Sequence, residues 1–155
     1  MEIVCVLIVV FSGLSGVFIA SRYRERKAFF ASLYNFLNYI KSNISFYKTR
    51  LEILIDNYDC ETKFKNFLIS VKNNLSSKVK NILPSYLTNQ EKDEFVKFVS
   101  SLQNFDVSET IRSIDFYLSL VKNKVNQTGE EAKIKIPLIE KLTLGAGLIV
   151  AIILI

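Results

Sequence analysis

Two long uncharged runs near opposite ends of the chain limit the folds open to it. Ile3–Ala20 holds eighteen residues without a charge, and Leu142–Ile155 holds fourteen. As a helix, the first run extends about 27 Å, close to the roughly 30 Å hydrocarbon core of a bilayer. The second extends only about 21 Å. It is therefore either a buried core helix or part of a longer membrane span.

The charges around the first run favour a retained transmembrane helix over a cleaved signal peptide. A signal peptide carries its basic residues before the apolar stretch, but here only Met1 and Glu2 precede it. Because Lys and Arg stay on the cytoplasmic side, we expect the N-terminus outside and the chain after Ser21 inside. The membrane-flanking residues expected on the inner side are Arg22, Tyr23, Arg24, Arg26, Lys27 and, before the second run, Lys141.

The second run becomes long enough to span a bilayer if it is counted from Pro137. Residues 137–155 then give about 28 Å of helix, provided that Glu140 and Lys141 reach toward the headgroups. A small domain would have difficulty covering such a helix on all sides. We therefore predict a transmembrane helix over 1–21, a cytosolic helical domain over 22–136 and a second transmembrane helix over 137–155.

Small residues recur at a spacing of four in both apolar runs. Ser12 and Gly16 form one such pair, and Thr143 and Gly147 form the other. Small residues at this spacing allow helix backbones to approach closely in a membrane. We expect these four residues to mark helix packing within the spans.

The middle of the chain has the apolar periodicity of helices, with two seams whose positions are three and four residues apart. The first includes Leu33, Leu37, Ile40 and Ile44, and the second includes Ile111, Ile114, Leu118 and Val121. This pattern predicts two antiparallel helices, either as a coiled-coil stem or as core faces of a small bundle. The fold class expected is all-α, a membrane hairpin of two transmembrane helices flanking a cytosolic helical bundle.

Capping sequences divide the domain further. Thr88–Glu91 and Asp106–Glu109 each have the pattern of a capping box that opens a helix. Thr49–Glu52 has the same pattern and predicts a helix break at Lys48, although the first seam continues through it. Pro84 is expected to end or kink a short helix that contains Val79, Ile82 and Leu83.

The composition argues against an enzyme. The chain has no His, and its two cysteines, Cys5 and Cys60, fall in the first apolar run and in the domain. No phosphate-binding loop or nucleophile elbow is present, and basic residues are scattered among acidic ones. We expect no cofactor, no metal and no nucleic-acid partner.

The order of these features resembles the stage III sporulation protein AB family over essentially the full length. The resemblance is carried by the Tyr23–Arg26 cluster, the Leu87–Thr88 helix start, the Leu102–Asp106 turn, and Gly145 and Gly147 in the last helix. It implies a helical cytosolic domain like those of the F-type membrane proteins of type II secretion systems. It further implies a subunit of a channel complex in the mother-cell membrane, with the cytosolic ATPase of that complex and its other membrane subunits as partners.

Two other functions fit the residues alone. A holin-like membrane-permeabilising protein would share the two spans and the basic flank. A generic membrane-tethered scaffold unrelated to sporulation would share every physical feature.

Overall fold

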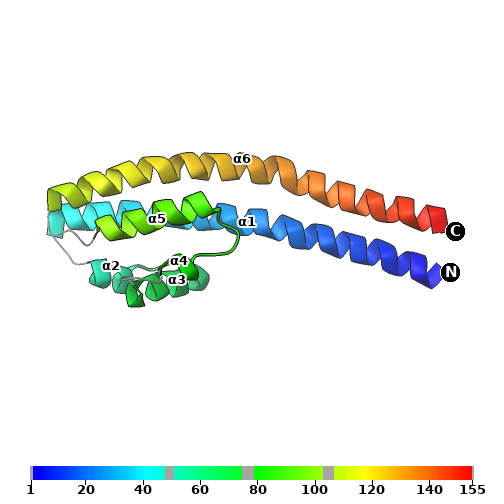
Figure 1. Cartoon of the computed structure of the whole chain (residues 1–155), viewed down its shortest axis with the longest axis horizontal. Helices are drawn as coiled ribbons and strands as arrows, with labels where there is room; N and C mark the ends of the chain where they lie inside the picture. The colour runs from blue at the N-terminus through cyan, green and yellow to red at the C-terminus, as the bar shows by residue number, and fades with distance from the viewer. Residues whose placement is uncertain (1, 48–50, 75–78, 103–106, 155) are drawn as a thin grey trace. The chain divides into compact units, whose positions relative to one another are not determined.

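The computed structural model describes residues 2–47, 51–74, 79–102 and 107–154. The chain forms two compact units, one of residues 1–28 and 126–155 and the other of residues 29–125. We call the first the helix pair and the second the bundle. The helices α1 (Glu2–Tyr47) and α6 (Val107–Leu154) contribute to both units (Figure 1).

The helix pair consists of the first part of α1 and the last part of α6, which run antiparallel. The Glu2 end of α1 and the Leu154 end of α6 lie at the same end of this unit (Figure 1). Both segments remain helical throughout, even at Pro137, which lies inside α6. Each long helix contains a segment long and apolar enough to cross a membrane.

Among the described residues, the bundle combines the second part of α1 and the first part of α6 with four shorter helices. These are α2 (Leu51–Asn57), α3 (Thr62–Asn73), α4 (Val79–Ile82) and α5 (Asn89–Ser101). No strand occurs in the described ranges. The all-α class expected from the sequence is therefore confirmed, with two long apolar helices flanking the shorter ones.

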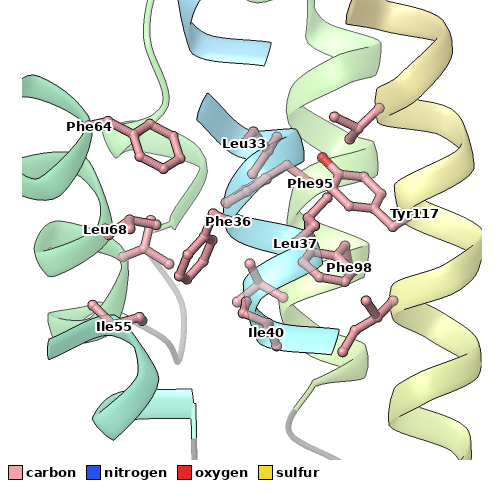
Figure 2. Packing of buried hydrophobic residues seen from close by; sticks show 14 of the residues in the cluster. Leu33, Phe36, Leu37, Ile40, Ile55, Phe64, Leu68, Phe95, Phe98 and Tyr117 are labelled. Atoms are coloured by element: carbon pink, nitrogen blue, oxygen red, sulfur yellow. The ribbon is translucent and has the colours of Figure 1, made fainter. Parts of the chain in front are cut away.

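A hydrophobic cluster forms the core of the bundle. In Figure 2, Leu33, Phe36, Leu37 and Ile40 of α1 lie between Ile55, Phe64 and Leu68 on one side and Phe95 and Phe98 on the other. Aromatic rings fill much of this core: the Phe98 and Tyr117 rings stack with centroids 4.2 Å apart. Such pairs add to the stabilisation from burial alone.

The helix boundaries follow the local signals in the sequence. Helix α1 is described as far as Tyr47 and α2 from Leu51 onward. The predicted break at Lys48 and the predicted caps Thr49–Glu52 and Asp106–Glu109 involve residues outside the described ranges. Helix α4 ends at Ile82, just before Pro84. A different device closes α2: the Lys65 ammonium donates to three carbonyl oxygens at its C-terminal end. A cation there satisfies unpaired carbonyls and complements the helix dipole.

The capping box that opens α5 is confirmed and extends into the core. The Thr88 hydroxyl accepts from the Glu91 backbone N–H at 3.2 Å, and the Glu91 carboxylate accepts from the Thr88 N–H at 2.9 Å. Glu91 is buried, and its other oxygen lies 3.3 Å from the Lys124 ammonium of α6. One carboxylate thus both starts α5 and ties it to α6.

Two substitutions at Glu91 separate these roles. Glu91→Gln keeps a side chain that can complete a capping box but loses the charge that faces Lys124. Glu91→Ala loses both, so we expect it to lower the free energy of unfolding by about 2–4 kcal/mol and Glu91→Gln by roughly half as much. Thermal unfolding of the full chain in detergent, followed by far-ultraviolet circular dichroism, measures the difference. Equal losses would show that the charge dominates, and exposed Asn89→Ala serves as the control.

Candidate functional site

The four small residues expected to pack within the spans lie against one another in the helix pair. The Ser12 hydroxyl donates a hydrogen bond to the Thr143 carbonyl oxygen. A Cβ atom built on Gly16 would meet the Thr143 side chain, with Thr143 Cβ at 3.0 Å. A Cβ built on Gly147 would meet Ser12 Cβ at 2.8 Å. The two backbones therefore approach closely because these positions carry no larger side chain.

Hydroxyl groups in the helix pair donate to main-chain carbonyls. The Thr143 hydroxyl donates to the carbonyl oxygen of Ile139 at 2.8 Å, and the Ser15 hydroxyl donates to that of Phe11. Such bonding satisfies polar groups where water is absent, as it is within a bilayer. The Ser15 and Thr143 hydroxyls are therefore compatible with a lipid environment.

Charged side chains join the same two helices beyond the apolar segments. Arg24 pairs with Glu140 at 2.7 Å, and Arg26 pairs with Glu131 at 3.0 Å. The Lys135 ammonium lies 5.3 Å from the centroid of the Tyr23 ring. Each of these ion pairs adds little to the free energy of unfolding when it is exposed to water. Several of them together favour one register of the two helices.

The remaining membrane-flanking residues face outward. The Arg22 guanidinium lies over the Phe18 ring, 5.7 Å from its centroid. Lys27 and Lys141 are exposed. The sequence identified the cations of this region but not Glu131, the carboxylate partner of Arg26. That pair depends on the register of α1 against α6, which the sequence does not give.

The two seams contribute to the same core in the bundle. All four first-seam residues, Leu33, Leu37, Ile40 and Ile44, are buried, as are Ile114 and Val121 of the second seam, whereas Ile111 and Leu118 are partly buried. An ion pair between Lys41 and Asp115, 2.6 Å apart, joins α1 and α6 within this unit. The seams therefore act as core faces of a bundle that also includes α5.

The buried face of α6 is shifted by one residue from the predicted seam at two positions: Thr110 is buried in place of Ile111, and Tyr117 in place of Leu118. Tyr117 is 6% exposed and lies deeper than its neighbour Leu118. Its ring packs on Phe98, so an aromatic residue takes the place expected for a leucine. Burial raises the pKa of Tyr117, and the nearby Glu94 and Glu91 carboxylates raise it further. Thr110, Ile114, Tyr117 and Val121 are spaced four, three and four residues apart, so this face could have been found from the sequence.

The described residues offer few side chains that could bind a metal ion. They contain no group of three or more His, Cys, Asp or Glu side chains that could hold a metal ion. Cys60 is a free, partly buried thiol whose pKa is raised by burial, which lowers its reactivity. The structural features that stand out are instead the close helix contact and the charges beside it.

These features define the class of the protein: an all-helical bundle attached to two helices that are long and apolar enough to cross a membrane. The chain belongs to the stage III sporulation protein AB family, whose model matches residues 2–155. It is therefore a member of a sporulation family, as the resemblance predicted. Comparison with curated proteins gives no match, and neither does comparison with solved structures.

The glycines of the helix pair allow a test of the close contact with controls on the same helices. Gly16→Val and Gly147→Val each place atoms where Thr143 or Ser12 lies, whereas Gly13 and Gly145 face open space. We expect the first two to destabilise the helix pair by about 1–3 kcal/mol and Gly13→Val and Gly145→Val to have little effect.

Disulfide trapping measures this outcome in membranes. Cysteines at Ile8 and Ala151, in a Cys5→Ser, Cys60→Ser background, would report the approach of the two helices in each glycine variant, because these positions lie four residues beyond the Ser12–Gly147 contact on each antiparallel helix. The packing assignment would be wrong if Gly13→Val reduced trapping as much as Gly16→Val.

Proposed function

We propose that this protein is a non-enzymatic membrane subunit of a sporulation channel or secretion-like complex. In this proposal α1 and α6 both cross the mother-cell membrane, and the bundle lies in the mother-cell cytosol. There it docks a cytosolic partner, the ATPase of the complex, while the helix pair meets other membrane subunits. Family membership supports the sporulation context.

The exposed apolar surface of the helix pair is the observation that carries the membrane assignment. Phe11 and Phe18 of α1 are each 66% exposed, and Ile152 and Ile153 of α6 are 71% and 77% exposed. Only 11% of the most apolar window in each helix is buried. A core helix of a soluble domain would be mostly covered, so lipid is the solvent that such a surface fits.

The charge distribution supports the proposed orientation. The cations of residues 22–27 follow the first apolar segment, and Lys133, Lys135 and Lys141 precede the second. Both groups therefore lie toward the bundle side of the two segments in the chain, which is the side that the positive-inside rule assigns to the cytoplasm.

Labelling with a membrane-impermeant maleimide tests this orientation. Cys60 is a poor reporter because it is partly buried with a raised pKa, so exposed Ser85→Cys is used in a Cys5→Ser, Cys60→Ser background. We expect labelling of Ser85→Cys only after permeabilisation, and labelling of a cysteine appended after Ile155 in intact cells. The reverse pattern would contradict the proposed topology.

Docking of a cytosolic partner requires a surface on the bundle, and α6 offers a large exposed aromatic side chain there. Phe116 is 67% exposed, beside the buried Tyr117. Aromatic residues contribute strongly to protein interfaces. We use Phe116 as the probe position because it faces solvent and its replacement leaves the core intact.

A photo-crosslinking amino acid at Phe116 tests the partner in sporulating cells. We expect a crosslink to the complex's cytosolic ATPase, identified by mass spectrometry. The matched probe at Phe18, 66% exposed on the helix pair, should capture lipid or membrane subunits instead. Recovery of no sporulation protein from either position, or loss of membrane potential on expression, would contradict the proposal.

A further inference from the structure

The contacts within the helix pair place the ends of its two apolar segments at one level. Gly16 lies against Thr143 in antiparallel helices. Four residues on from Gly16 is Ala20, and four residues back from Thr143 is Ile139. Because both helices rise equally per residue, Ala20 and Ile139 lie at about the same height. The charged residues 22–27 of α1 and 130–141 of α6 therefore surround the helix pair at the edge of the apolar segments; we call them the charged collar.

The charged collar has more cations than carboxylates. Its seven cations are Arg22, Arg24, Arg26, Lys27, Lys133, Lys135 and Lys141, and its four carboxylates are Glu25, Glu130, Glu131 and Glu140. Two of the carboxylates are paired within the helix pair: Glu140 with Arg24, and Glu131 with Arg26. The other Glu131 oxygen accepts from the Gln127 amide at 3.1 Å. Arg24 and Arg26 are thus paired with carboxylates, and the remaining cations of the collar are Arg22 and the four lysines.

The four lysines of the collar are exposed. Lys27, Lys133 and Lys141 face solvent, and Lys135, also exposed, lies over the Tyr23 ring. Next to the lysines of α6, the side chains of Ile134, Leu138 and Leu142 are 67%, 51% and 62% exposed and follow one another at a spacing of four. Ammonium groups beside such a stripe suit the boundary between acyl chains and headgroups, where long side chains extend toward the polar layer.

We infer that the charged collar binds the phosphate groups of anionic lipid headgroups and so gives the protein a preference for anionic lipid in the surrounding membrane. Lys133 and Lys141 are about 12 Å apart along α6, so the cations line a surface instead of converging on one small anion. The adjacent apolar stripe provides a place for acyl chains, which a free phosphate lacks. Each lysine near an anionic membrane surface contributes appreciably to such attraction. The inference rests on the membrane insertion proposed above.

Native mass spectrometry of the full chain tests the inference. The protein is released from nanodiscs that contain equal amounts of phosphatidylglycerol and phosphatidylcholine, and the lipids that stay bound are counted. We expect the wild type to retain phosphatidylglycerol preferentially. The ratio of retained phosphatidylglycerol to phosphatidylcholine should fall about tenfold in the triple variant Lys27→Gln, Lys133→Gln, Lys141→Gln. Lys97→Gln, Arg112→Gln and Lys122→Gln, at exposed positions of the bundle, remove the same charge and should leave it unchanged.

Three outcomes would overturn the inference. Equal retention of the two lipids by the wild type would remove the preference itself. If both triple variants lost the preference for phosphatidylglycerol equally, the preference would come from net charge. If millimolar inorganic phosphate displaced phosphatidylglycerol, the collar would be a site for free anions. Extraction of the wild type by alkaline carbonate would instead refute the proposed spans, so the two proposals fail in distinguishable ways.

Discussion

The close contact of Ser12 and Gly16 with Thr143 and Gly147 fixes the register of the helix pair. Because Gly16 and Gly147 carry no side chain, the two backbones approach until the hydroxyl-bearing residues touch them. This register also brings Arg24 to Glu140 and Arg26 to Glu131. Small residues and ion pairs therefore act on the same antiparallel alignment, and the level of the charged collar follows from it.

In the bundle, stability depends on burial and on a polar link between α5 and α6. Leu33, Leu37 and Ile40 of α1 lie in the same cluster as the rings of α3, α5 and α6. Glu91 is buried there, yet its charge is acceptable because Thr88 and Lys124 both contact it. The core of the bundle is thus rich in aromatic rings, and the capping box fixes the N-terminus of α5.

The two units suit two different solvents, and this difference supports the proposed role. The bundle buries its apolar side chains, whereas the helix pair exposes Phe11, Phe18 and Ile153. The proposed role requires a folded domain that is held beside a membrane. Membership of the stage III sporulation protein AB family gives that arrangement its sporulation context.

The sequence by itself determined the helical class, the two apolar segments and the α5 cap, because periodicity, uncharged length and capping chemistry are local properties. It also singled out the four small residues, since their spacing is visible along one helix. Only the tertiary structure decided that Tyr117 is buried more deeply than Leu118, and that Glu131 and Glu140 partner Arg26 and Arg24. Such facts depend on the rotation and register of one helix against another, which the packing of distant side chains sets.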